Sequence, residues 1–97
     1  MINPKQRAKL KSLSQNMDPI INIGKNGITD NLIREIEDLL TSRELIKIKI
    51  LNNNMDDPKE MIEEILSKTS SDFVSHLGFK FVIFRQNKDP KKRKVNL

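Results

Sequence analysis

The strongest pattern of apolar and polar positions lies between residues 30 and 43, where apolar side chains recur every three or four residues. The recurring positions are Leu32, Ile33, Ile36, Leu39 and Leu40. Such spacing gives a helix one broad apolar stripe, and Thr29 just before it is a residue type that caps helix N-termini. The pattern therefore predicts an amphipathic helix from roughly Asp30 to Arg43.

A second set of helix signals opens the chain. Asn3 is a good N-cap, Pro4 suits the first helical position, and Gln6 is placed to complete a capping box. We expect a narrow apolar seam along this helix at Gln6, Leu10, Leu13 and Met17. The helix should end at Asp18-Pro19, because the residue before a proline disfavours helical geometry.

The same kind of start recurs near residue 57. Asp57 can cap a helix, Pro58 suits its first position, and Glu60 supplies an acid at the third. The helix should continue to about Thr69, with its buried stripe at Met61, Ile62, Ile65, Leu66 and Thr69.

Four shorter stretches have strand patterns. Residues 20–23 form a short apolar run, and residues 45–51 alternate so that Lys47 and Lys49 lie opposite the isoleucines. Residues 73–77 and 80–85 flank Gly78-Phe79 in the manner of a hairpin. The pattern assigns no role to Lys47 and Lys49.

The predicted order is helix, strand, helix, strand, helix, strand, strand. Strands separated by helices of about 14 residues favour parallel pairing through a crossover, whereas the last two strands should pair antiparallel. The sequence therefore predicts an α/β domain over residues 1–86, with a mixed four-stranded sheet packed with helices. Residues 87–97 have little to bury, so we expect a flexible basic tail.

The composition is that of one small domain with a net positive charge. The chain has 97 residues, no cysteine and a formal net charge of +5. No stretch approaches the roughly 20 apolar residues that span a bilayer, and the N-terminus lacks the apolar region of a signal peptide, so we expect a cytoplasmic protein. We also expect a monomer.

Basic residues gather at both ends of the chain. Residues 1–11 carry four basic residues and no acid, and residues 88–97 carry five against Asp89. Charged termini can simply aid solubility, but they can also form a face that binds a polyanion. The candidate basic contacts are Lys5, Arg7, Lys9, Lys11, Arg34, Lys91, Lys92 and Arg93.

The most informative segment is a short loop, Gly24-Lys25-Asn26-Gly27, between the first strand and the helix at residue 30. Two glycines let a backbone turn its N–H groups toward one point, and the following helix start adds the positive end of its dipole. Lys25 adds a charge. The loop thus suits a phosphate, although Asn-Gly after a strand is also a common hairpin turn.

Nothing in the sequence favours catalysis. His76 is the only histidine, no cysteine is present, and the glycine loop is too short for a nucleotide-binding phosphate loop. We therefore expect no enzymatic activity, metal, cofactor or small-molecule substrate.

The chain also lacks Tyr and Trp, and its four phenylalanines lie in the hairpin region, where we expect them in the core. Recognition should then depend on backbone contacts and shape, which points to folded RNA.

Several blocks of the sequence resemble the bacterial YhbY family, the stand-alone form of the CRM domain (chloroplast RNA splicing and ribosome maturation). The blocks occur in family order and together cover roughly residues 3–86. They are Leu10-Lys11-Ser12-Leu13-Ser14, the run from Pro19 to Thr29, Glu44 to Ile50, and Gly78 to Arg85.

The resemblance implies a fold similar to the C-terminal domain of translation initiation factor three, with a GxxG loop presented much as in KH domains. It assigns RNA contact to Gly24, Lys25, Asn26 and Gly27, and a basic position to Lys11. The bacterial members are associated with precursors of the large (50S) ribosomal subunit, which implies ribosomal RNA as the ligand. Phe84 departs from the tyrosine that the family commonly has, so this chain lacks the hydroxyl and any hydrogen bond that it makes in the family, whereas the expected fold is unaffected.

A second hypothesis is a protein-interaction adaptor on the ribosome or the translation machinery. In that case the acidic outer faces of the second and third helices would carry the main contact. Contacts that survive RNase would favour the adaptor over the RNA-binding protein.

Overall fold

The computed structural model describes residues 2–97. Its helices are α1 (Pro4–Ser14), α2 (Asp30–Arg43) and α3 (Pro58–Thr69). Its strands are β1 (Ile21–Ile23), β2 (Leu45–Ile50), β3 (Asp72–Leu77) and β4 (Lys80–Phe84), followed by a 3₁₀ turn at Pro90–Lys92. The predicted element order is confirmed, and the bounds of α2 match the prediction.

The strands form one mixed sheet in the order β1-β2-β4-β3. β1 and β2 are parallel, as expected for strands joined through a helix, and β4 pairs antiparallel with both β2 and β3. The predicted α/β class is therefore confirmed. The last strand lies between its two neighbours, which brings β2 and the hairpin into one continuous surface.

Side-chain caps fix where the helices begin. Asn3 and Gln6 make both bonds of a capping box, at 2.8 and 3.0 Å, and the Thr29 hydroxyl accepts from the backbone N–H of Leu32 at 3.1 Å. Asp57 accepts from the N–H of Lys59 at 3.0 Å. These bonds confirm the three predicted helix starts.

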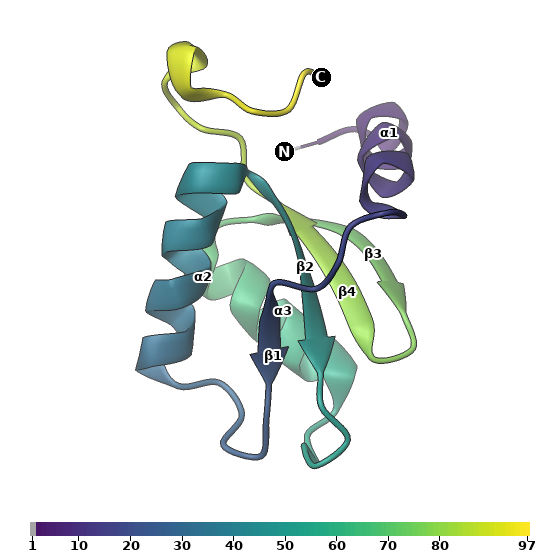
Figure 1. Cartoon of the computed structure of the whole chain (residues 1–97), viewed down its shortest axis with the longest axis vertical. Helices are drawn as coiled ribbons and strands as arrows, with labels where there is room; N and C mark the ends of the chain where they lie inside the picture. Colours follow the sequence, from purple (N-terminus) through teal and green to yellow (C-terminus); the bar gives the residue numbers. More distant parts are fainter. Residues whose placement is uncertain (1) are drawn as a thin grey trace.

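Each face of the sheet carries its own hydrophobic cluster. α2 and α3 cover one face, where their apolar stripes pack on the isoleucines of β1 and β2 and on Phe81 and Ile83 of β4. α1 lies over the other face, and its Leu10 packs with Leu45, Val74, Val82 and Phe84. α1 covers only part of that second face, toward the upper end of the sheet (Figure 1).

The predicted apolar seam of α1 is partly wrong. Leu10 is fully buried, but Leu13 is 49% exposed, and Ser14 is buried beside Leu10 instead. The predicted helix end at Asp18-Pro19 is also wrong, because the helix ends at Ser14. The Ser14 hydroxyl donates to the Lys11 carbonyl at 2.8 Å, so this buried polar group has a partner. Met17 lies beyond the helix end and still packs against the second cluster.

The expectation that all four phenylalanines lie in the core is also partly wrong. Phe81 and Phe84 are buried, whereas Phe73 is 37% and Phe79 is 60% exposed. Phe79 lies in the hairpin turn between β3 and β4. Phe73 precedes a register shift of β3, which is an edge strand.

The C-terminal segment buries more than the sequence predicted. Val95 and Leu97 pack against the second cluster, so the expectation that this segment has little to bury is wrong. Glu44, which follows α2, is buried, and its carboxylate accepts hydrogen bonds from the backbone N–H groups of Asn87, Lys94 and Val95. The segment is thereby held beside α1, at the upper end of Figure 1.

Burial raises the pKa of the Glu44 carboxyl, but the three backbone hydrogen bonds and the charge of Arg93 outweigh that effect. The pKa therefore lies below its usual value of 4.5. The ionised carboxylate is the form that joins the C-terminal segment to the end of α2.

Candidate nucleic-acid interface

The glycine loop is a tight turn between β1 and α2. The N–H of Gly27 donates to the carbonyl of Gly24 at 3.1 Å, and the Asn54 side-chain amide donates to the same carbonyl at 2.8 Å. Within residues 2–97, the N–H groups of Lys25 and Asn26 have no hydrogen-bond acceptor. Lys25 is exposed, so two free backbone donors and an ammonium group face solvent together.

The two glycines of the loop differ in what they permit. Gly27 has φ +65°, and a Cβ there would lie 2.9 Å from a carboxylate oxygen of Asp56. Gly24 needs no positive φ, and a Cβ there would meet its nearest atoms, on Asn53 and Leu51, at 3.9 Å. Gly27 is therefore the position at which glycine is needed for the turn itself.

The helix that follows the loop is already capped. Thr29 satisfies the N–H of Leu32, and Asp30 places a carboxylate in the first turn of α2. An anion is therefore bound more favourably at the loop donors and Lys25 than at the helix start. Arg34, one turn into α2, is exposed and donates to the Asn31 side chain at 3.0 Å.

The side of the loop toward α3 is acidic. A cleft of about 310 Å³ runs from Asn26 and Gly27 to α3, and it is lined by Asp56, just before α3, and by Glu60 and Glu64 of the helix. Carboxylates in such a cleft repel a phosphodiester backbone. A polyanion held by the loop is therefore favoured on the opposite side, over the open face of the sheet.

The structure brings the two basic ends of the chain together, but it does not bring them to the loop. α1 and the C-terminal segment lie at the upper end of the molecule, and the glycine loop lies at the lower end (Figure 1). The basic residues at the upper end are Lys5, Arg7, Lys9 and Lys11 of α1, and Lys91, Lys92 and Arg93.

Two of these cations also have structural partners. Arg7 donates through Nε to the carbonyl of Phe73 at 3.0 Å, and Arg93 donates to the carbonyl of Asn87 at 2.9 Å. Each still has guanidinium N–H groups that can reach a phosphate. The lysines of α1 and of the 3₁₀ turn are exposed.

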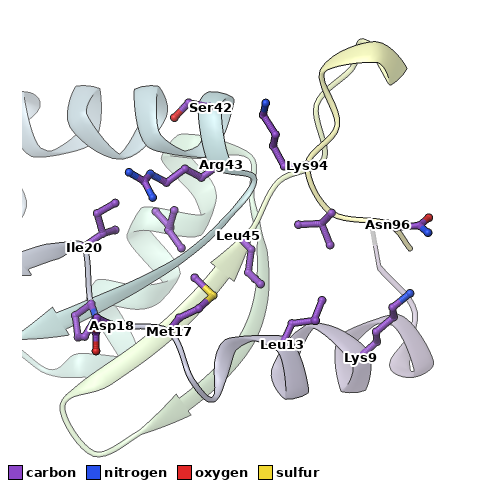
Figure 2. A pocket seen from close by; sticks show the side chains of 13 residues that line it. Lys9, Leu13, Met17, Asp18, Ile20, Ser42, Arg43, Leu45, Lys94 and Asn96 are labelled. Carbon is purple, nitrogen blue, oxygen red and sulfur yellow. The ribbon is translucent and has the colours of Figure 1, made fainter.

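A groove of about 890 Å³ lies between α1, the start of β2 and the C-terminal segment. Figure 2 shows Leu13, Met17 and Leu45 along it, with Lys9, Arg43 and Lys94 around its rim. The groove accounts for the exposure of Leu13. The sequence did not predict this groove, because the docked C-terminal segment forms one of its walls.

Sequence reasoning also left three sheet lysines without a role. Lys47 and Lys49 of β2 and Lys80 of β4 lie on the face that α1 only partly covers. The alternation in residues 45–50 indicated this face for Lys47 and Lys49. Lys80 joins them through the β2–β4 register, which the sequence pattern alone does not give.

Other kinds of site are absent from the part of the chain that the structure describes. Over residues 2–97, no cluster of His, Cys, Asp or Glu could hold a metal ion, and no helix is long and apolar enough to cross a membrane. His76 shares a hydrogen bond of 2.9 Å between Nε2 and the carbonyl of Gly78, within the hairpin.

The chain is similar to a known domain family and to several known proteins. The CRS1 / YhbY (CRM) domain matches residues 2–85. The "Probable RNA-binding protein YqeI" of Bacillus subtilis is 33% identical over 91 residues, which cover 94% of this chain and 95% of that protein. An "RNA-binding protein" of Haemophilus influenzae is 30% identical over 90 residues, covering 93% and 91%.

A solved structure has the same fold. The solution structure of the hypothetical protein SAV1595 from Staphylococcus aureus superposes with a TM-score of 0.79 at 44% identity. The match covers 99% of this chain and 100% of that one. The fold is therefore shared over nearly all of this chain.

Proposed function

The chain belongs to the CRS1 / YhbY (CRM) domain family, and on that premise we propose that it is a non-catalytic protein that binds RNA through the loop of residues 24–27. The names of the relatives in Bacillus subtilis and Haemophilus influenzae support RNA as the ligand. The observation that carries the proposal is the pair of free N–H groups at Lys25 and Asn26, next to the Lys25 ammonium.

The loop would hold one phosphate of the RNA backbone. Two neighbouring N–H groups without a protein acceptor and one cation match the charge and the oxygen lone pairs of a phosphodiester, and they read no base. The hydrogen bond from Asn54 to Gly24 and the left-handed Gly27 fix the loop before RNA arrives, so little ordering entropy is lost on binding.

We further propose that the ligand is ribosomal RNA in precursors of the large subunit, bound by a monomer in the cytoplasm. Similarity to the bacterial YhbY proteins supports this assignment. The basic α1 and C-terminal segment, at the far end from the loop, would add phosphate contacts to a ligand that spans the molecule. An RNA with tertiary structure can reach both ends.

The test is a binding titration of the purified protein with a fragment of large-subunit ribosomal RNA at several salt concentrations. We expect affinity to fall steeply as salt rises, because each neutralised phosphate releases counterions. A flat salt profile, or no binding at low salt, would contradict the proposal.

Co-sedimentation from cell lysates with and without RNase separates RNA binding from the adaptor hypothesis. We expect the protein to travel with large-subunit precursors and to be released by RNase. Association that survives RNase would instead favour a protein contact through the exposed acids of α2 and α3, Glu35, Asp38, Glu60, Glu63 and Glu64.

A further inference from the structure

Three lysines project from one face of the sheet. In β2, the isoleucines pack into the cluster under α2 and α3, so Lys47 and Lys49 lie on the opposite face. In β4, Phe81 and Ile83 face the same cluster, which places Lys80 on the lysine face. Lys49 and Lys80 are exposed, and Lys47 is half-buried.

The strand register aligns these residues into a row across all four strands. Asn22 of β1 pairs with Lys49, Lys49 pairs with Lys80, and Lys80 pairs with Leu77 of β3. Neighbouring strands are about 4.8 Å apart, so one row crosses the whole sheet on one face. All four residues are exposed. The row Asn22, Lys49, Lys80 and Leu77 is called the sheet row below.

The pairing of Lys49 with Lys80 is unfavourable in the free protein. Like charges directly opposite each other on antiparallel strands repel, and an anion placed between them removes that repulsion. Within residues 2–97, the ion pairs join Lys68 to Glu64 and Arg85 to Glu37, so no carboxylate compensates the sheet lysines. The charge of the row is available to a ligand.

The sheet row has one end close to the start of the glycine loop. Asn22 lies two residues before Gly24, which corresponds to about 7 Å along a strand. Lys47 lies two residues farther up β2, toward α1. The row and Lys47 therefore occupy the surface between the loop and the basic α1 at the upper end of the molecule (Figure 1).

The surroundings of the row fit a single-stranded RNA segment. On the other side of the loop, Asp56, Glu60 and Glu64 repel phosphates, so a strand held by the loop is directed over the sheet face. Phe79 is 60% exposed in the hairpin turn, next to Lys80, and offers an aromatic surface for a base.

We propose that the polar residues of the sheet row, with Lys47, bind the phosphodiester backbone of the single-stranded RNA segment that adjoins the phosphate held by the glycine loop. This inference rests on the proposed function, because it extends the RNA path from the loop over the sheet. Lys49 and Lys80 bind one backbone segment between them, and Lys47 binds the next segment toward α1.

The test compares two double variants that lose the same charge. Lys49→Gln with Lys80→Gln removes the paired cations of the row, and Lys59→Gln with Lys68→Gln removes two exposed cations of α3, on the other layer. Both variants have a formal net charge of +3, that is, the parent +5 less two lysines. The probe is a fluorescent oligouridylate, because backbone binding requires no base sequence.

We expect the sheet variant to bind on the order of tenfold more weakly than the α3 variant at about 0.1 M salt, and its log–log salt slope to fall by about 1.4. Neither variant should melt well below the parent. The sheet variant loses the repulsion between Lys49 and Lys80, and the α3 variant loses only the exposed Lys68–Glu64 ion pair. Equal RNA affinity of the two double variants would overturn the inference. That result is also the one expected if the row binds an acidic protein and not RNA.

A failure of the inference differs from a failure of the proposed function. If the parent binds the probe and Lys25→Ala weakens binding, but the sheet variant matches the α3 variant, only the sheet path is wrong. If the parent binds neither the probe nor ribosomal RNA, the proposed function is wrong and the inference is overturned with it.

Discussion

The Glu44 carboxylate accepts a hydrogen bond from the backbone N–H of Val95 at 2.9 Å, although the two residues are 51 positions apart in the chain. The contact joins the end of α2 to the C-terminal segment, and the N–H groups of Asn87 and Lys94 complete it. It places Lys94 on the rim of the groove in Figure 2. One buried acid thus determines where the basic C-terminal segment lies.

Glu44→Gln should destabilise the protein by about 1–3 kcal/mol. The amide keeps the shape of the side chain, but its NH₂ group replaces one accepting oxygen, which leaves at least one part-buried backbone N–H without an acceptor. Urea unfolding measures the loss. Limited proteolysis should also cut residues 88–97 faster in the variant. Unchanged stability and protection would mean that Glu44 does not hold the segment.

The contribution of Glu44 should depend on pH in the acidic range. Because its pKa in the folded protein lies below the usual value of 4.5, its stabilisation is complete above that value and is lost as pH falls through the folded pKa. The difference in unfolding free energy between the parent and Glu44→Gln should therefore be constant near neutral pH and shrink below about pH 4.5. Urea titrations at pH 7 and pH 3 measure this change. A difference that grows on acidification would contradict the assigned pKa.

Gly27→Ala should cost about 1–2 kcal/mol, because alanine is strained at φ +65°. The carboxylate of Asp56 can move away from the new methyl group, so most of the lost stability comes from the strained backbone. Gly24→Ala is the matched control, since its Cβ meets nothing closer than 3.9 Å, and its stability should stay within about 0.5 kcal/mol of the parent. Thermal melts measure the loss of stability in each variant. Equal losses would contradict the positive φ of Gly27.

Arg85→Lys should destabilise the fold by about 1–3 kcal/mol without changing RNA affinity. The guanidinium donates to the Glu37 side chain and the Thr69 carbonyl at 2.8 Å, and to Thr41 at 3.0 Å, which links α2 to the end of α3. A lysine ammonium cannot make this forked set of bonds. Melting and RNA titration are measured together, and a loss of affinity without a loss of stability would place Arg85 in the interface instead.

The sequence predicted those parts of the fold that depend on near neighbours. The caps Asn3, Thr29 and Asp57 act within three residues, and the alternation around Lys47 and Lys49 needs only one strand, so the elements and their faces followed from local pattern. The prediction that Leu13 is buried was wrong, because in a helix of only 11 residues the tertiary contacts decide which side is buried.

The parts that escaped prediction depend on distant pairings. Nothing local to Glu44 indicates that its partners are Asn87, Lys94 and Val95, so the docked C-terminal segment and its groove could not be predicted. Likewise, Lys80 reaches Lys49 only because β4 inserts between β2 and β3. The loop of residues 24–27 was found from the sequence because its glycines and lysine are contiguous.

The most direct test of the central claim compares the RNA affinity of Lys25→Ala with that of Lys59→Ala. Lys59 is an exposed lysine of α3, and its substitution removes the same charge. With a fragment of large-subunit ribosomal RNA at about 0.1 M salt, Lys25→Ala should bind roughly fivefold more weakly than the control, with an unchanged melting temperature. If the two variants bind RNA equally at low and high salt, the glycine loop is only a turn, and the claim that it holds the RNA backbone is wrong.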